Sequence, residues 1–190
     1  MLINIRGTSG SGKTTLMRRF FELCTSVAKI QPADSKKPKG YECIYKGEKV
    51  FVVGSYENVC GGCDTISTQD EIHQIIDDFA FEGHVMFEGL FISHIYGRYA
   101  ERAKREPDNH VFIMLETPFD TCMSHIQNRR EAAGKSTVLK DSVYNNARKT
   151  YDSTYRIRNK LTADGLVWEE LKLENRFVQF EELIDFYLGV

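Results

Sequence analysis

The chain has 190 residues, of which 42% are apolar and 27% are charged, and its net charge is −2. This size suits one compact domain, and no segment approaches the roughly 20 consecutive apolar residues of a membrane helix. Five cysteines, an odd number, disfavour a disulfide framework. The small net charge disfavours a protein that binds polyanions without specificity. We therefore expect one soluble, cytoplasmic domain over residues 1–190.

The N-terminal segment carries the strongest motif of the chain. An apolar strand is predicted over Leu2–Arg6 and a helix over Lys13–Cys24, and between them GTSGSGKT matches G-x-x-x-x-G-K-[ST]. Glycines let successive N–H groups point at a phosphate, the lysine reaches the β- and γ-phosphates, and the threonine hydroxyl binds Mg²⁺. The predicted nucleotide-binding residues are Gly7, Thr8, Ser9, Gly10, Ser11, Gly12, Lys13, Thr14 and Thr15.

A polar loop over 31–40 and a hairpin of strands over 41–45 and 50–53 lead to the unusual segment GSYENVCGGCDTI. Its glycines suit a substrate pocket at the end of a strand. We expect Tyr56 to stack on a base, Gly61 and Gly62 to admit the substrate, and Asp64 to accept a hydroxyl proton. The alternative is an ordinary surface loop in which Asp64 caps a turn.

Thr68, three residues before Glu71, predicts the start of a helix that runs to about residue 82. A short apolar strand over 84–87 then ends at Glu88, before a helix predicted over 91–105. Ligands gather at the carboxyl ends of parallel strands, so Glu88 resembles a Walker B acid. It could hold Mg²⁺ together with Thr14 or accept a proton, and the alternative is a carboxylate that caps the next helix.

A strand over 111–115 precedes a helix that begins at Thr117-Pro118 and ends at Arg129 and Arg130. The flexible loop after this helix makes the region similar to the lid of nucleoside, nucleotide and polynucleotide kinases, here over about 129–140. Lid arginines stabilise the charge of a phosphoryl group in transfer, so one of the two is expected to be catalytic. The alternative is that the helix dipole alone favours them.

The long helix predicted over 139–161 belongs to a basic region, because residues 129–160 contain nine Lys or Arg and three Asp or Glu. Arg148 lies there among tyrosines at helical spacing, a pattern that suits a polynucleotide track with Arg148 as a substrate-binding residue. A helix that buries its tyrosines against the sheet would look the same. A strand over 166–171 and a helix over 180–188 complete the chain.

Strands that alternate with helices predict an α/β fold with a parallel sheet. Together with the glycine-rich motif, Glu88 and the arginine lid, the chain resembles the P-loop kinase superfamily, on its nucleotide and polynucleotide kinase side. The resemblance implies a three-layer fold, with an about five-stranded, mainly parallel sheet flanked by helices and a lid.

The segment GSYENVCGGCDTI further resembles bacteriophage 5-hydroxymethyluracil DNA kinases. This resemblance implies ATP with Mg²⁺ as the donor, DNA containing 5-hydroxymethyluracil as the partner, and the host cytoplasm as the place of action. The expected reaction transfers the γ-phosphate to the hydroxymethyl group of the base. Two alternatives stay open: a small-molecule nucleoside or nucleotide kinase, which suits the small net charge, and a nucleotide-switch NTPase, which needs no arginine lid.

Overall fold

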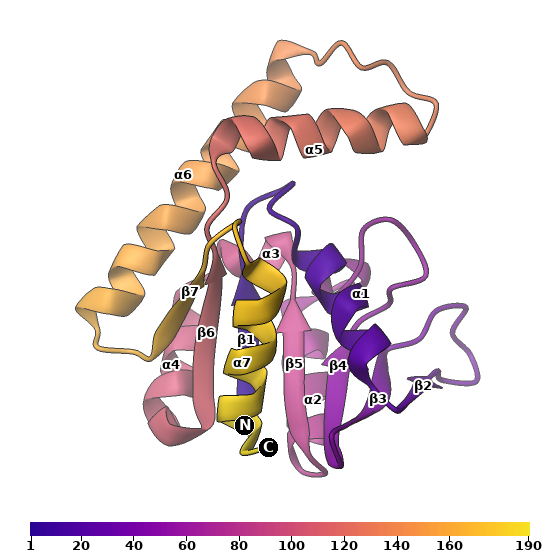
Figure 1. Cartoon of the computed structure of the whole chain (residues 1–190), viewed down its shortest axis with the longest axis vertical. Coiled ribbons are helices and arrows are strands. Elements are labelled where there is room, and N and C mark those ends of the chain that lie inside the picture. Colours follow the sequence, from indigo (N-terminus) through magenta and orange to yellow (C-terminus); the bar gives the residue numbers. More distant parts are fainter.

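The computed structural model describes all residues 1–190 and contains one seven-stranded sheet in the order β2-β3-β4-β5-β1-β6-β7 (Figure 1). The neighbours from β4 to β7 pair in parallel, whereas β2 and β3 form an antiparallel edge. The strands are β1 (Leu2–Arg6), β2 (Ser26–Ile30), β3 (Gly40–Tyr45), β4 (Glu48–Val53), β5 (His84–Glu88), β6 (His110–Leu115) and β7 (Trp168–Leu171). The α/β prediction is confirmed. The sheet has two strands more than the about five implied by the resemblance, and β2 is the one strand that was not predicted from the sequence.

Helices cover both faces of the sheet, and two more lie over the carboxyl ends of its parallel strands. In Figure 1, α1 and α7 lie over the near face, while α2 and α4 lie behind it. The helices are α1 (Lys13–Leu23), α2 (Gln69–Ala80), α3 (Leu90–Ser93), α4 (Gly97–Arg105), α5 (Phe119–Ala132), α6 (Asp141–Ala163) and α7 (Arg176–Leu188). None of them is both long and apolar enough to cross a membrane.

The alternation of side chains along β1 explains the three layers. Ile3 and Ile5 point to the face where Phe20 of α1 and Phe180 of α7 pack, and all four side chains are buried. Leu2 points to the opposite face, where it joins a second apolar cluster that includes Ile76 of α2. Because both faces of the strand are covered, β1 is buried along its whole length. The carboxyl end of β1 is therefore held rigidly, level with the carboxyl ends of the neighbouring parallel strands. This end of the sheet is called its carboxyl edge below.

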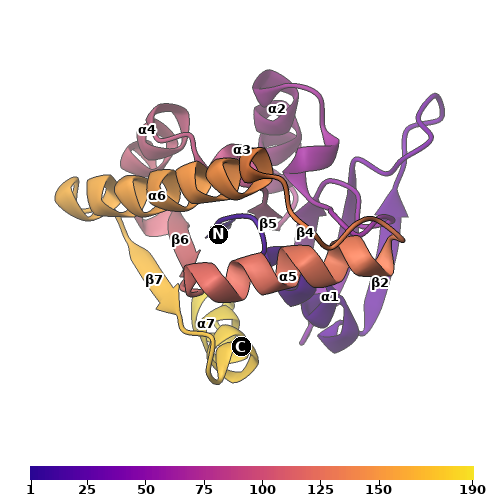
Figure 2. The same cartoon turned by 90° about the horizontal axis from the view of Figure 1, so that it is seen from above.

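Helices α5 and α6 form an arm, residues 119–163, that stands on this carboxyl edge. Figure 2 shows the two helices lying across the edge when the molecule is viewed from above. Phe119, Met123 and Ile126 of α5 pack against Ala147 of α6 in a small apolar cluster of their own. The second half of α6 is anchored to the main body through Ile157 and Leu161, which belong to the core behind the sheet. The arm is thus fixed at its base and stands over the phosphate loop.

Two predicted helix boundaries were wrong. The helix expected over 91–105 is divided into α3 and α4, because the carbonyl of Ile95 accepts a hydrogen bond of 2.9 Å from Nη1 of the buried Arg6 instead of continuing the helix. The last helix begins at Arg176 rather than near Phe180, after Asn175 in a left-handed conformation with φ of 62°. Both boundaries are set by the conformation and contacts of residues that carry no helix-start motif.

Candidate active site

The phosphate loop connects β1 to α1 at the carboxyl edge of the sheet. Gly10 and Gly12 adopt φ angles of 80° and 97°, which residues with a side chain rarely adopt. Gly12 is also the N-cap of α1. A Cβ on Gly10 would lie 2.3 Å from the carbonyl oxygen of Cys122, at the foot of the arm. The glycine therefore serves two purposes, since it shapes the loop and allows α5 to sit directly against it.

Lys13 lies at the floor of the loop and is 7% exposed. Its Nζ donates to the carbonyls of Gly7 at 2.9 Å and Thr8 at 3.1 Å. Burial lowers the pKa of Lys13, and the nearby negative charges of Glu88 and Asp64 oppose this shift. The ammonium group is held by weak neutral acceptors in a place where phosphate oxygens would be much stronger partners.

Glu88 and Thr14 lie together beside Lys13. The Thr14 hydroxyl donates to Oε1 of Glu88 at 3.1 Å, and Glu88 is 1% exposed. Burial raises the pKa of Glu88 to about 7, although Lys13 pulls it down. A hydroxyl and a carboxylate are hard oxygen donors of the kind that Mg²⁺ prefers, and a cation would offset the cost of burying the ionised acid. The two predicted metal-binding residues therefore fit a magnesium ion.

A cavity of about 660 Å³, here called the donor cavity, joins the phosphate loop to residues from distant parts of the chain. Ser9 to Thr15 line it, together with Asp64, Glu88 and Arg129 from three other segments. At another side, Leu173 and Phe177 add an apolar wall. Gly7 and Thr8 do not line the cavity but lie below it, where their carbonyls hold Lys13. The volume falls in the range of small-molecule sites, roughly 300–1,000 Å³.

Arg176 is a residue of this site that no sequence motif predicts. Its guanidinium donates to the Ser11 carbonyl at 2.7 Å, to the Glu116 carbonyl at 2.5 Å and to the Thr117 hydroxyl at 2.7 Å. It also donates to the carbonyl of Leu171, the last residue of β7, at 3.4 Å. Arg176 thereby ties the phosphate loop to the ends of β6 and β7, and it lines the donor cavity. No motif marks Arg176, because Ser11, Glu116 and Thr117, its partners at 2.7 Å or less, lie 59 to 165 residues away in the chain.

Asp64 lines the donor cavity and also caps a helix. Its Oδ2 accepts the N–H of Leu90 at 2.8 Å and its Oδ1 accepts the N–H of Phe91 at 2.9 Å, at the start of α3. The capping alternative is therefore correct in part, and it coexists with a position in the cavity. These two bonds fix the orientation of the carboxylate, which is a requirement for a precisely placed proton acceptor.

Gly61 and Gly62 are buried and do not form the wall of a substrate pocket. A Cβ on Gly62 would lie 2.5 Å from the Glu88 carbonyl oxygen, and one on Gly61 would lie 2.7 Å from the Tyr56 ring. Their role is to let the segment pack tightly against the end of β5. The expectation that they admit the substrate directly is corrected accordingly.

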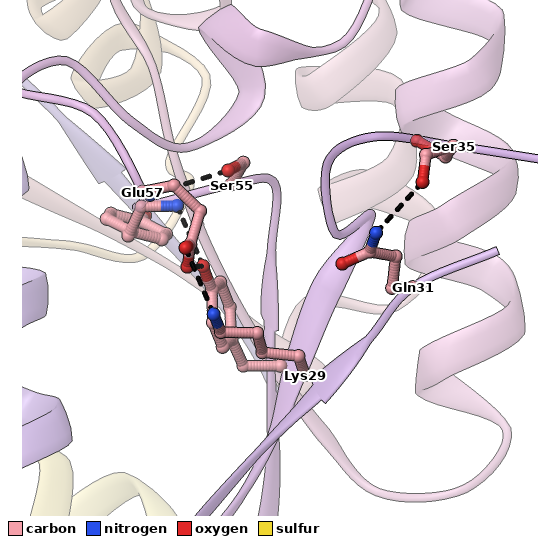
Figure 3. Close-up of polar contacts among 7 residues, drawn as sticks. Lys29, Gln31, Ser35, Ser55 and Glu57 are labelled. Atoms are coloured by element: carbon pink, nitrogen blue, oxygen red, sulfur yellow. Dashed lines mark hydrogen bonds and ion pairs between the residues drawn. The ribbon is translucent and has the colours of Figure 1, made fainter. Parts of the chain in front are cut away.

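Tyr56 is likewise a packing residue rather than a stacking platform. It is 7% exposed, and its ring meets Phe21 edge to face at 5.3 Å between centroids. The next residue, Glu57, is fixed on the antiparallel edge, where Oε2 binds Nζ of Lys29 at 3.0 Å and its N–H approaches Oγ of Ser55 (Figure 3). A base cannot reach the Tyr56 ring in this arrangement. Tyr56 is instead packed against Phe21 of α1 and Tyr41 of β3, whereas residues 57–60 of the same segment are exposed.

A second cavity of about 620 Å³, here called the arm cavity, lies between α5, α6, α3 and residues 58–60. Arg129 and Ser9 line both cavities, so the two adjoin each other there. The Arg129 guanidinium lies 3.4 Å from the thiol of Cys60. Arg130 faces only the arm cavity, and its Nε donates to the Ser136 carbonyl at 3.0 Å, which holds the loop between the two helices.

Arg148 lies outside both cavities. Its guanidinium stacks 4.8 Å from the centroid of the Phe119 ring and pairs with Asp152 at 3.6 Å on the exposed side of α6. The alternative, in which the tyrosines of this helix are buried against the sheet, does not describe Tyr151, because its ring packs against Phe119 of α5 within the arm. A role of Arg148 in substrate binding would have to involve the outer surface of α6.

Comparison with known proteins identifies the family of the chain. No family model matches, but the chain is 33% identical over 186 residues to the 5-hmdU DNA kinase of Pseudomonas phage PaMx11, with 97% of each protein covered. It is 28% identical over 193 residues to the 5-hmdU DNA kinase of Pseudomonas phage M6, covering 96% of this chain and 97% of that protein. A 5-hmdU DNA kinase 1 of Salmonella phage ViI is 25% identical over 146 residues, which span 70% of this chain and 60% of the relative. Given the near-complete coverage at 33% identity and the phosphate-binding site described above, the chain belongs to the family of phage 5-hmdU DNA kinases.

Proposed function

We propose that this protein transfers the γ-phosphate of ATP to the hydroxymethyl group of 5-hydroxymethyluracil in DNA, with Mg²⁺ as the metal. The observation that supports this most directly is the position of Arg129 in the lining of two adjoining cavities. One cavity has the phosphate loop at its floor, and the other is open beside a basic arm. A nucleotide-switch protein has no need of a second cavity that adjoins the first at an arginine.

The residues around the donor cavity can be assigned roles in the transfer. Lys13 would bind the phosphates, and Thr14 and Glu88 would hold Mg²⁺, which supplies neutralisation of the phosphate charge. As the acceptor oxygen bonds to the γ-phosphorus, the bond from that phosphorus to the bridging oxygen breaks and the nucleoside diphosphate leaves with the electron pair. Arg129 would stabilise the charge on the transferring group, and Asp64 would accept the hydroxyl proton.

The identity of the acceptor is tested by transfer of labelled γ-phosphate. We expect label to enter a duplex oligonucleotide that contains 5-hydroxymethyluracil, and not an otherwise identical duplex that contains thymine, since thymine has no hydroxyl to attack. Free 5-hydroxymethyl-2′-deoxyuridine serves as the small-molecule acceptor. Label that enters the free nucleoside faster than the modified duplex would replace the DNA kinase with a small-molecule kinase.

Salt dependence gives a second test of the DNA acceptor. Each neutralised phosphate releases counterions, so the apparent KM for DNA should rise steeply with salt, by about tenfold or more between 50 and 200 mM if several phosphates are bound. Replacement of Arg148, Lys149 and Arg156 by alanine should flatten this dependence. The matched control replaces Lys49, near the start of β4, and Lys104 and Arg105, at the end of α4, all of which lie outside the arm. A flat profile in the unmodified protein would contradict the DNA assignment.

A further inference from the structure

The wall that α6 contributes to the arm cavity is a single helix face. Val143, Asn146, Ala147 and Thr150 line the cavity, and their spacing of three and four residues places them side by side on the helix. Asn146 is exposed and is the only one of the four that carries an amide. Because it stands on a helix rather than on a loop, its amide is presented from a rigid support.

This helix face is tied to the phosphate loop. The hydroxyl oxygen of Thr150 lies 3.2 Å from that of Thr8, and the Thr150 hydroxyl also lies 2.8 Å from the Ala147 carbonyl. Ser9, the neighbour of Thr8, lines both cavities. The position of Asn146, one turn before Thr150, is therefore set relative to the place where the transferable phosphate would lie.

The arm cavity has the chemistry to hold a pyrimidine. Leu90, Ile126 and Val143 offer apolar surfaces for the faces of a ring, and Arg129 and Arg130 offer positive charge for the phosphoryl group. A carboxamide presents a donor and an acceptor side by side, which is the pattern that complements the pairing edge of a base. In a duplex that edge is already occupied by the partner base. An amide in this cavity can bind it only when the nucleotide has rotated out of the helix.

A polar groove adjoins the arm cavity at Thr150. It is lined by His94, Lys149, Thr150, Asp152, Ser153 and Arg156, with no apolar side chain. Lys149, Ser153 and Arg156 provide donors for a phosphodiester, while Asp152 is paired with Arg148. A strand whose phosphates lie in this groove could send one base over Thr150 into the cavity. The polar groove thus suits the phosphate of a nucleotide, and the arm cavity suits the base of the same nucleotide.

We propose that Asn146 binds the pairing edge of the acceptor base, held in the arm cavity after it has left the DNA helix. This inference rests on the proposed function and adds to it the residue that positions the acceptor. The backbone of the same nucleotide lies in the polar groove on the other side of Thr150.

The test compares Asn146→Ala with Asn145→Ala, a matched control that removes the same side chain from the preceding position of α6. We expect Asn146→Ala to lower kcat/KM for the modified duplex at least about tenfold and to leave the dissociation constant of the nucleotide unchanged, because a lost bidentate contact weakens only the acceptor side. Asn145→Ala should retain the activity of the unmodified protein. Equal kcat/KM in the two variants would overturn the inference, whereas an unmodified protein that fails to phosphorylate the duplex would overturn the proposed function instead.

Cys60 offers a readout that needs no catalysis. It is exposed and lines both cavities, whereas Cys43, Cys63 and Cys122 are buried and Cys24 is half-buried. Without nucleotide, the modified duplex should slow maleimide labelling of the Cys60 peptide in the unmodified protein and in Asn145→Ala, and much less in Asn146→Ala. The same degree of protection in both variants would show that the base is not held by Asn146.

Discussion

Replacing Lys13 by alanine should lower the rate of phosphoryl transfer at least about a hundredfold, the usual cost of removing one group that stabilises developing charge. The reason is its place at the floor of the loop, where Nζ is held by the Gly7 and Thr8 carbonyls and is 7% exposed. A phosphate that enters the donor cavity would find no other ammonium group there, because the remaining basic side chains that line it are the arginines at 18, 129 and 176 and His125. Affinity for the nucleotide should also fall.

The fold should survive this substitution. Lys13 makes its two bonds to backbone carbonyls of its own loop, and burial of its charge opposes folding. Arg105→Ala removes an exposed cation from the end of α4 and serves as the control for a change of charge alone. We would compare single-turnover transfer and thermal melting in the three proteins. Near-normal turnover by Lys13→Ala with an unchanged melting curve would remove Lys13 from the mechanism.

The phosphate loop could be predicted from the sequence because every part of it is local. The strand, the glycines, Lys13 and Thr14 lie within one stretch of the chain, and the backbone angles of Gly10 and Gly12 are a property of those residues themselves. Glu88 was predicted by a topological argument, since the ends of neighbouring parallel strands must meet. The register that places Glu88 opposite Ile5 of β1 bears this out.

The residues that could not be predicted depend on contacts between distant segments. Arg176 bonds to carbonyls that come together only when β6, β7 and the phosphate loop are assembled. Tyr56 is an aromatic residue in a glycine-rich segment, which suggests an exposed ring that stacks on a base, but its ring is covered by Phe21 of α1. The strand β2 has mostly exposed residues and is defined by its pairing with β3 rather than by an apolar pattern. In each case the sequence supplies the side chain and the tertiary structure supplies its role.

Glu88→Gln should have two opposite effects, a large loss of phosphoryl transfer and a gain in stability. Transfer should fall because the neutral amide can neither hold Mg²⁺ strongly nor offset its charge. Stability should rise because burial raises the pKa of Glu88 from its ordinary value of 4.5 to about 7. Between these values the folded protein retains a proton that the unfolded chain has released, so the free energy of unfolding falls as the pH rises towards 7.

The size of the gain follows from the pKa of about 7, which already includes the attraction of Lys13. A shift of this size corresponds to ~3 kcal/mol, so Glu88→Gln should be more stable than the unmodified protein by about that amount at pH 8 and by almost nothing below pH 4.5. Urea unfolding followed by Trp168 fluorescence, with a chelator and without nucleotide, measures the difference. Parallel pH dependence of the two proteins would contradict the prediction.

Asp64→Asn is the control that separates the two carboxylates of the donor cavity. Asp64 is exposed and bound to two backbone N–H groups, so its replacement should not produce the stability gain at high pH. If Asp64 accepts the hydroxyl proton, Asp64→Asn should lower the transfer rate far more than it weakens nucleotide binding, since a base acts mainly in the transition state. Near-normal transfer by this variant would remove Asp64 as the base. The proton would then go to Glu88, whose pKa of about 7 also suits a base at neutral pH, or the transfer would need no base, since it depends chiefly on positioning and charge. A buried metal ligand at position 88 predicts both a stability gain at high pH and a loss of transfer in Glu88→Gln. A proton acceptor at position 64 predicts a loss of transfer in Asp64→Asn without a stability gain.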